Sequence, residues 1–353
     1  MLFQIGSTVT LGVVIYYILY IRDWLDLDKG PILTNKPGKC QVIQEAGGSE
    51  DIVDIGDGVF LISTGFGFGS FKSGEIVSLD VKDDNKLVTM NLTNIPQNVD
   101  EFLASPHGMS LWKDPSTGDL YLYVITHPSK EDRIEVFIVE NAHQLRHIKT
   151  ITDPSFTYMN DLVMVGLDKF YTTRYLTLSR TEYWYIFFEH ICQQKWGKIF
   201  YYDGRKAREV SSGHYMGNGI NSSPDKSMIY VAEWGGHVLK AFYRQGSNDL
   251  VPAWEKHIDT GLDNIYVDKN GDLWIGGVDR IWTVVNPFSK TTPPSQVLRV
   301  KIRDQAVADV EEIYTDDGQE CSLATTGAYA YGKLVIGTVS SQTVVCDVNF
   351  LSP

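Results

Sequence analysis

The chain has 353 residues, with 31 basic and 44 acidic side chains, and a formal net charge of −13 at pH 7. Phosphate backbones repel such an acidic chain, so nucleic acid is excluded as a partner. Hydrophobic residues make up 43% of the chain and aromatic residues 12%, which is typical of a globular domain built from many short strands.

The N-terminal segment is apolar. Residues 1–20 contain no charged side chain, and Arg22 follows them. About 20 apolar residues can span a bilayer, so residues 1–22 are predicted to form a transmembrane signal anchor, with a linker over residues 23–38. A cleaved signal peptide and a buried core segment are the alternatives, although residues 16–20 lack the small side chains of a cleavage site.

Different features of the sequence favour opposite orientations of this anchor in the membrane. Arg22 and Lys29 follow the segment, which favours a cytosolic body. Cys40 and Cys346 lie near the two ends of the body, where a disulfide would close it, and a disulfide needs an oxidising compartment. Asn91 begins a glycosylation sequon. We expect the body to lie in the ER lumen or outside the cell.

A polar residue opens a short apolar strand six times along residues 39–353, and each time a tight turn leads to a second apolar strand. The openers are Glu50-Asp51, His107, Asn160-Asp161, Asn218, Asp263-Asn264 and Thr325. Gly, Asn and Asp in the turns supply the backbone angles of hairpins. The repeats recur about every 45 to 60 residues, the scale of a propeller blade. We therefore predict an all-β fold, a six-bladed β-propeller over residues 39–353.

The innermost strand of each blade lines the channel of a propeller, so the openers are expected to converge there. The predicted metal ligands among them all offer oxygen: Glu50, Asp51, Asn160, Asp161, Asn218, Asp263 and Asn264. Calcium takes about six to eight oxygen ligands, whereas zinc prefers His or Cys. Capping of a strand or turn is the alternative for each residue alone. It does not explain why the residues keep phase with the repeats.

Two histidines are placed for chemistry beside such a metal. His107 opens the second repeat, and His127 follows the strand paired with that opening strand. A histidine pair can activate water, while a metal polarises a carbonyl group. This arrangement predicts hydrolysis of an ester or lactone, with structural histidines as the alternative. The chain has no Gly-x-Ser-x-Gly elbow, which argues against a serine hydrolase.

Taken in order, these motifs resemble the paraoxonase/arylesterase family over residues 39–347. The motifs are Gly48-Ser-Glu-Asp51, Ser105-Pro-His-Gly108, Thr126-His-Pro128, Met159-Asn-Asp-Leu162, Gly217-Asn-Gly-Ile-Asn221, Leu262-Asp-Asn-Ile265 and Gly337-Thr-Val339. The resemblance implies a six-bladed propeller with two calcium ions in its tunnel. It also implies activity as a lactonase or arylesterase on a small-molecule substrate.

The resemblance also implies roles for single residues. It gives the exposed, catalytic calcium these ligands: Glu50, Asn160, Asn218, Asp263 and Asn264. It gives the deeper, structural calcium Asp51, Asp161 and the backbone carbonyl of Met109. His107 and His127 match the catalytic histidine dyad of the family. Cys40 and Cys346 match its ring-closing disulfide.

Two pairs of residues depart from the family pattern. Tyr175-Leu176 stands where paraoxonases carry Asp-His, and Gly277-Val278 stands where they carry Cys-His. Some nematode paraoxonase-like proteins are membrane-anchored and assist assembly of degenerin-type sodium channels, so a non-catalytic chaperone or accessory subunit is the alternative function. The aromatic residues 183–188 then contact membrane or partner, unless they belong to the core. The pairing of Cys192 and Cys321 is open.

Overall fold

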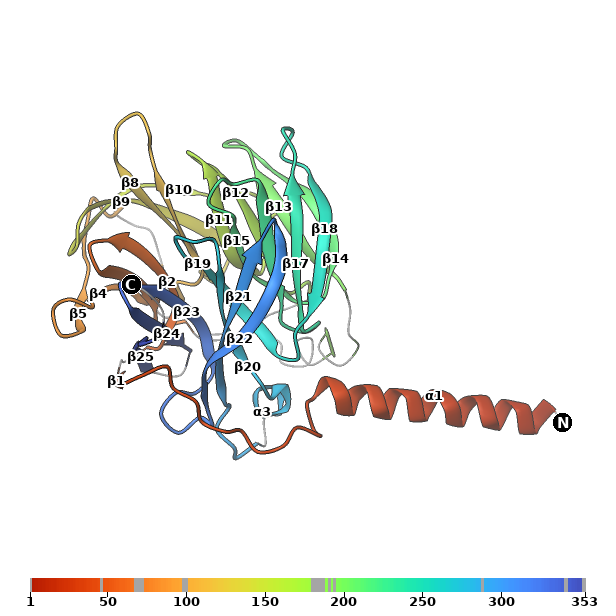
Figure 1. Cartoon of the computed structure of the whole chain (residues 1–353). Helices are drawn as coiled ribbons and strands as arrows, with labels where there is room; N and C mark the ends of the chain where they lie inside the picture. Colours follow the sequence, from red (N-terminus) through yellow and green to blue (C-terminus); the bar gives the residue numbers. More distant parts are fainter. Residues whose placement is uncertain are drawn as a thin grey trace.

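The strands form six sheets around one axis (Figure 1), as the repeats predict for a six-bladed propeller. A computed structural model describes residues 2–44, 47–66, 73–96, 101–178, 188, 189, 192, 195–286, 289–339 and 342–350, and side chains from residue 10 onward.

The first three blades follow one another along the chain. The first contains β2 (Ser49–Gly56), β3 (Val59–Thr64), β4 (Glu75–Asp80) and β5 (Lys86–Thr89). The second contains β7 (Met109–Lys113), β8 (Leu120–Thr126), β9 (Arg133–Asn141), β10 (Gln144–Ile151) and β6 (Asn91–Thr93), which pairs with β10 in parallel. The third contains β11 (Met159–Gly166), β12 (Lys169–Arg174), β13 (Gly197–Tyr202) and β14 (Ala207–His214).

The remaining blades complete the circle. The fourth contains β15 (Gly217–Ser222), β16 (Met228–Glu233), β17 (Val238–Arg244) and β18 (Leu250–His257). The fifth contains β19 (Gly261–Val267), β20 (Leu273–Val278), β21 (Ser295–Arg303) and β22 (Ala306–Asp316), with the short helix α3 (Ile281–Val285) after β20. The sixth contains β23 (Ala324–Ala330), β24 (Lys333–Thr338), β25 (Gln342–Asp347) and β1 (Cys40–Gln44).

Turn residues with positive φ explain the hairpins. Asp57 and Gly58 have φ of 57° and 88° between β2 and β3. Tyr331 and Gly332 have φ of 56° and 74° between β23 and β24. Two consecutive residues with positive φ match the twist of antiparallel strands, and Gly adopts such angles without steric cost.

The two ends of the propeller meet in one sheet. β1 pairs with β25, and Cys40 lies opposite Cys346. The two residues form a disulfide across a sequence separation of 306, which confirms the predicted pairing. Each inner strand contacts the next around the axis, including β23 with β2. The ring is thus closed by strand pairing and by a covalent bond.

Adjacent blades are held together by apolar side chains between their sheets. Tyr230 and Leu239 of the fourth blade pack against Leu262 and Leu273 of the fifth, and all four are buried. Full burial of one such side chain contributes about 1.5–3 kcal/mol. These contacts fix the blades against one another, and so hold the inner strands in place around the axis.

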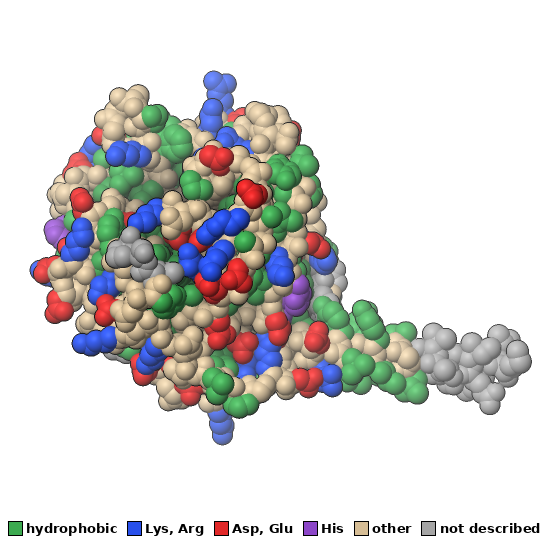
Figure 2. All heavy atoms as spheres, viewed as in Figure 1, with side chains coloured by type: hydrophobic (Ala, Val, Ile, Leu, Met, Phe, Trp, Pro, Cys, Tyr) green, Lys and Arg blue, Asp and Glu red, His purple; other side chains and the backbone are tan. Residues whose placement is uncertain are grey.

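Helix α1 (Leu2–Trp24) extends away from the propeller (Figure 1). Figure 2 shows hydrophobic side chains on the part of α1 next to the propeller. No helix in the described part of the chain is long and apolar enough to cross a membrane, so the predicted transmembrane helix is not found.

The C-terminal end of α1 is bound to the rim of the propeller. The indole Nε1 of Trp24 donates a hydrogen bond to the carbonyl oxygen of Gly235 at 3.0 Å. The carboxylate of Asp26 accepts one from the backbone N–H of Ile281 at 2.9 Å and lies 3.0 Å from the Lys29 ammonium. The start of the predicted linker over residues 23–38 is therefore packed against the fourth and fifth blades.

Cys321 is a buried free cysteine, so it does not pair with Cys192; burial raises the pKa of its thiol to about 12. In the aromatic segment 183–188 only Phe188 lies among the described residues, where it is exposed.

The ring-closing disulfide should contribute strongly to stability. Replacing both Cys40 and Cys346 by Ser opens a very long loop in the unfolded chain, and we expect a loss of about 2–5 kcal/mol in the free energy of unfolding. Urea unfolding with and without dithiothreitol measures it. Dithiothreitol should destabilise the wild type and a Cys192→Ser control, but not the double variant. Equal urea midpoints for wild type and double variant would contradict this.

Candidate functional site

Inner strands that carry predicted ligands are bulged at the ligands themselves. The register against the neighbouring strand shifts in β2, β11, β15 and β19. In each of these strands one shift skips two residues, and the skipped residues are Glu50-Asp51, Asn160-Asp161, Asn218-Gly219 and Asp263-Asn264. A β-bulge turns side chains out of the regular alternation and is frequent beside functional sites. The bulges therefore aim these polar side chains toward the axis.

Glycines let the bulged strands approach one another closely. A Cβ atom on Gly219 would lie 2.5 Å from the carbonyl oxygen of Asp263 and 2.6 Å from the Cα of Asn264. A Cβ atom on Gly108 would lie 2.5 Å from Oδ1 of Asp161. No larger residue fits at either position without displacing backbone. This proximity gathers predicted ligands of separate blades into one volume.

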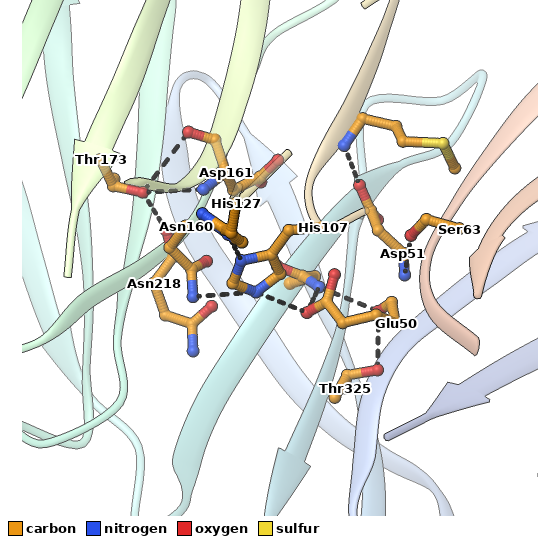
Figure 3. Close-up of polar contacts among 12 residues, drawn as sticks. Glu50, Asp51, Ser63, His107, His127, Asn160, Asp161, Thr173, Asn218 and Thr325 are labelled. Carbon is orange, nitrogen blue, oxygen red and sulfur yellow. Dashed lines mark hydrogen bonds and ion pairs between the residues drawn. The ribbon is translucent and has the colours of Figure 1, made fainter. Parts of the chain in front are cut away.

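Glu50 lies beside His107 and Thr325 in this volume (Figure 3). Its Oε1 accepts a hydrogen bond from Nδ2 of Asn264 at 2.9 Å and lies 3.2 Å from Nε2 of His107. Its backbone carbonyl accepts one from the hydroxyl of Thr325 at 2.7 Å. Thr325 opens the sixth repeat, so this blade supports the ligand set although none of the predicted ligands belongs to it.

Five buried side-chain oxygens of this group have no hydrogen-bond partner. They are Oε2 of Glu50 and the Oδ1 atoms of Asn160, Asn218, Asp263 and Asn264. Leaving one buried polar atom unsatisfied costs about 1–3 kcal/mol. All five atoms are acceptors from four different strands, and they coincide with the ligand set expected for an exposed calcium ion. The donor set fits a hard cation with several oxygen ligands.

A second pair of carboxylates lies beside the first group. Asp51 accepts hydrogen bonds from the backbone N–H of Met109 at 2.6 Å and of Ile52 at 2.8 Å. Asp161 accepts them from Ile220 at 2.8 Å and Leu162 at 2.7 Å. Both side chains are therefore fixed in orientation. The backbone of Met109, the third predicted member of this pair's site, is in direct contact with Asp51.

The electrostatics of the tunnel also favour a cation. Burial raises the pKa of Glu50 to about 8. Burial, together with the charge of neighbouring carboxylates, raises the pKa of Asp51, Asp161 and Asp263 well above the usual range. None of the lysines and arginines in the described ranges forms an ion pair with these four groups. A cation would favour their charged form and remove the repulsion among them.

The two predicted histidines are in contact and extend to a third residue. Nδ1 of His107 lies 2.8 Å from Nε2 of His127, and Nδ1 of His127 lies 2.9 Å from Oδ1 of Asp132. The other oxygen of Asp132 accepts the backbone N–H of Met159 at 2.8 Å. The ring of Phe66 stacks on His107 with centroids 4.0 Å apart. A carboxylate that orients a histidine is typical of general-base sites.

Sequence reasoning missed Asp132 and Phe66. Asp132 lies five residues after His127 in the connection between β8 and β9, and this spacing is the only local signal for its role. Its second hydrogen bond comes from the next blade, at Met159, and Phe66 approaches His107 from the first blade. Neither contact follows from a local pattern.

The residues that depart from the family pattern belong to the packed rim of the site. Leu176 is buried together with Met216, Trp234 and Ile281, and Trp24 of α1 joins this cluster. Met216 directly precedes β15, which carries Asn218, whereas Leu176 and Trp234 follow β12 and β16, the strands that pair with the ligand-bearing β11 and β15. The wall of the site on this side is therefore apolar, and α1 contributes to it.

The second departure is also explained by packing. Val278 is fully buried at the end of β20. A Cβ atom on Gly277 would lie 2.7 Å from Cγ2 of Thr260 and 2.9 Å from the carbonyl oxygen of Gly261. A cysteine at this position would need displacement of Thr260 and of the neighbouring backbone. Glycine is therefore the residue that allows β20 to approach Thr260 and Gly261 this closely.

Another cluster with metal-ligand residues lies outside the tunnel. Asp26, His237 and Asp259 place one possible ligand atom each within 4.8 Å of one another. The ammonium group of Lys29 lies 3.0 Å from Asp26 and 3.3 Å from Asp259. Lys29 already supplies positive charge to this cluster, so its geometry argues for a fastening of the α1 end rather than a metal site.

Comparison with known proteins finds relatives over most of the chain. A family model described as Arylesterase matches residues 33–348. Serum paraoxonase/arylesterase 2 of Gallus gallus is 31% identical over 313 residues, which cover 85% of this chain and 86% of that protein. Serum paraoxonase/lactonase 3 of Homo sapiens is 29% identical over 324 residues, covering 89% of this chain and 90% of that protein.

Solved structures agree on the fold alone. Aldose sugar dehydrogenase of Streptomyces coelicolor superposes with a TM-score of 0.53 at 13% identity, covering 88% of this chain and 99% of that one. The match of the family model over most of the chain and the identity to the chicken paraoxonase show that this chain belongs to the arylesterase family, the family of the serum paraoxonases.

Proposed function

We propose that the protein is a calcium-dependent hydrolase that cleaves lactones and aryl esters. Membership of the arylesterase family supports a hydrolytic esterase or lactonase. The roles of calcium and histidine in this proposal rest on one observation. A hydrogen-bonded His-His-Asp series lies next to a cluster of buried oxygens that have no hydrogen-bond partner. The two features meet at Glu50: Nε2 of His107 lies 3.2 Å from Oε1 of Glu50, and the other oxygen of this carboxylate, Oε2, belongs to the cluster.

Two calcium ions are assigned to the tunnel in this proposal. The ion nearer to His107 would be held by Glu50, Asn160, Asn218, Asp263 and Asn264. The other would be held by the carboxylates of Asp51 and Asp161 and the backbone carbonyl of Met109. Calcium bound at the first site supplies Lewis-acid polarisation of the substrate carbonyl. The second would serve the fold.

His107 is the general base. Its Nδ1 is used in the contact with His127, so Nε2, on the side of Glu50 and Asn160, is the atom that faces the ligand cluster. In this proposal Nε2 takes a proton from water, and the resulting hydroxide adds to the carbonyl carbon. The ester C–O bond then breaks, and the proton returns to the leaving oxygen. In a lactone the leaving oxygen stays attached to the acid product.

His127 and Asp132 prepare His107 for this step. Asp132 accepts a hydrogen bond from Nδ1–H of His127, which leaves Nε2 of His127 as the acceptor for Nδ1–H of His107. This assigned tautomer leaves Nε2 of His107 unprotonated and able to accept a proton. As positive charge develops on His107, His127 and Asp132 stabilise it, because a carboxylate next to an imidazole favours its charged form.

The proposal includes a location in the ER lumen or outside the cell, attached to a membrane through α1. The Cys40–Cys346 disulfide supports an oxidising compartment, and the exposed Asn91 of the sequon is accessible to glycosylation. Apolar side chains of α1 are about half exposed on successive positions: Val13, Val14, Ile15, Tyr16, Tyr17, Ile18 and Leu19. Such a surface favours contact with lipid at the membrane surface.

Calcium removal should destabilise the protein. Because a bound ion stabilises only the folded state, EGTA should lower the melting temperature, and calcium but not zinc should restore it. Asn218→Ala, which removes one partnerless oxygen, should weaken calcium binding at least about tenfold, a loss of about 1.4 kcal/mol.

Asn221→Ala is the matched control, since Asn221 lies on the same strand but donates to the backbone of Ile265. Its calcium affinity should equal that of the wild type. A melting curve that EGTA leaves unchanged would exclude a stabilising calcium ion.

His107→Gln should lower kcat for lactone hydrolysis by about 10²–10⁴, the usual contribution of a general base, with an unchanged melting temperature in calcium. Asp132→Asn should lower kcat with little change in KM, because the amide disturbs the tautomer of His127. The exposed His143, replaced by Gln, is the control. Retained kcat in His107→Gln would overturn the proposed base.

The same variant separates hydrolysis from the competing accessory role in the assembly of degenerin-type sodium channels. If hydrolysis is the biological function, His107→Gln fails to restore function in cells that lack the protein. Full restoration by His107→Gln would favour the non-catalytic role.

Deleting residues 2–22 should release the propeller from the membrane fraction without unfolding it. Removal of the exposed apolar side chains removes the proposed contact with lipid, whereas the blades keep their core and disulfide. Fractionation with alkaline carbonate and a thermal melt of the released protein measure both effects. A full-length protein found in the soluble fraction would contradict the attachment.

A further inference from the structure

A chain of hydrogen bonds outside the tunnel joins a serine, a histidine and a glutamate. Oγ of Ser211 lies 2.8 Å from Nε2 of His214. Nδ1 of the same imidazole lies 2.8 Å from Oε1 of Glu233. Ser211 and His214 belong to β14, the outermost strand of the third blade, and Glu233 ends β16 of the fourth. The tunnel mechanism uses none of these three residues.

Irregularities in β14 produce this contact. The register between β13 and β14 shifts twice, and the shifts skip Val210 and Gly213 on either side of Ser211. Gly213 has a φ of 81°, and a Cβ atom there would meet open space. In a regular strand, residues three apart point to opposite faces. The bulge at Gly213 brings His214 back toward the side of Ser211.

Among the three hydrogen-bonded residues, the histidine and the glutamate are buried and the serine is more exposed, as a nucleophilic site requires. His214 and Glu233 are each 2% exposed, so their mutual orientation is fixed by packing. Ser211 is only partly buried, and the adjacent Ser212 is exposed. The hydroxyl group is therefore the member of the chain that can meet a molecule from solution.

We propose that Ser211 is the nucleophile of a second, metal-independent esterase site, with His214 as its base and Glu233 as the group that orients the imidazole. This activity goes beyond the calcium-dependent hydrolysis proposed for the tunnel. The chain lacks the Gly-x-Ser-x-Gly elbow, but nucleophile, base and orienting acid are recognised by their geometry and not by their sequence spacing.

The charge on Glu233 suits this role. Burial opposes ionisation of Glu233, but the hydrogen bond from His214 and the charge of Lys240 outweigh it and hold its pKa below the usual range. The ammonium group of Lys240 lies 2.6 Å from the same oxygen that His214 contacts. Glu233 is therefore a carboxylate at neutral pH and stabilises the imidazolium that forms when His214 takes a proton.

The reaction needs no additional reactant besides an ester and water. Oγ of Ser211 attacks the carbonyl carbon, and its proton moves to Nε2 of His214. The C–O bond of the ester breaks, and the alcohol leaves with that proton. Water, deprotonated by His214, then releases the acid and restores the serine. β14 is an edge strand of its sheet, and such strands present unpaired N–H groups that can bind the developing oxyanion.

A fluorophosphonate–biotin probe tests this proposal on the full-length protein. Ser211 attacks phosphorus, fluoride leaves and a stable Oγ–P bond remains, which tryptic digestion and tandem mass spectrometry locate. We expect the label on Ser211 in the wild type and its loss in Ser211→Ala. Ser212→Ala is the matched control, because it removes the exposed neighbouring hydroxyl and should keep the wild-type labelling rate.

Two further variants test the dependence on the histidine and the acid. His214→Gln should slow labelling of Ser211 by about 10²-fold or more, the range for loss of a general base. Glu233→Gln, which replaces one carboxylate oxygen by an amide nitrogen, should slow the labelling of Ser211 as well. Thermal melts identify any variant that is unfolded. An unlabelled Ser211 in the folded wild type, labelling of Ser212 at an equal rate, or an unchanged rate in folded Glu233→Gln would overturn the proposal.

Discussion

Buried negative charge at the axis of the propeller is the constraint on which the rest of the structure depends. The carboxylates of Glu50, Asp51, Asp161 and Asp263 are all buried there, and no lysine or arginine in the described ranges pairs with them. Uncompensated charges of this kind are unstable in a protein interior. Either they are protonated or a cation joins them, and the partnerless oxygens of Asn160, Asn218 and Asn264 favour the cation.

Turns, contacts between blades, the disulfide and strand bulges together hold these carboxylates at the axis. Hairpin turns build the blades, apolar contacts between blades fix the inner strands, and the Cys40–Cys346 bond closes the ring. Bulges then turn consecutive polar residues of four inner strands toward one volume. The same end of the blades carries the His107–His127 contact and the apolar rim that includes Trp24 of α1. Helix attachment, rim and tunnel are thus parts of one end of the molecule.

Much of this could be predicted from the sequence because the information is local. Turn residues such as Asp57 and Gly58 specify hairpins, and polar residues in phase with six repeats specify inner-strand positions. Contacts between blades could not be predicted in this way. Asp132 is oriented by the N–H of Met159 in the next blade, and His214 beside Ser211 is oriented by Glu233, also in the next blade. For α1, hydropathy alone predicted a transmembrane helix, and it could not reveal the fastening of its end to the rim.

The calcium content of the purified full-length protein tests the central claim most directly. Plasma mass spectrometry after gel filtration in calcium-containing buffer, followed by a wash in calcium-free buffer, counts ions per chain. We expect two calcium ions per chain at the tunnel and no stoichiometric zinc. A folded protein that carries no calcium under these conditions would contradict it, because the buried carboxylates would then be stabilised by protonation alone.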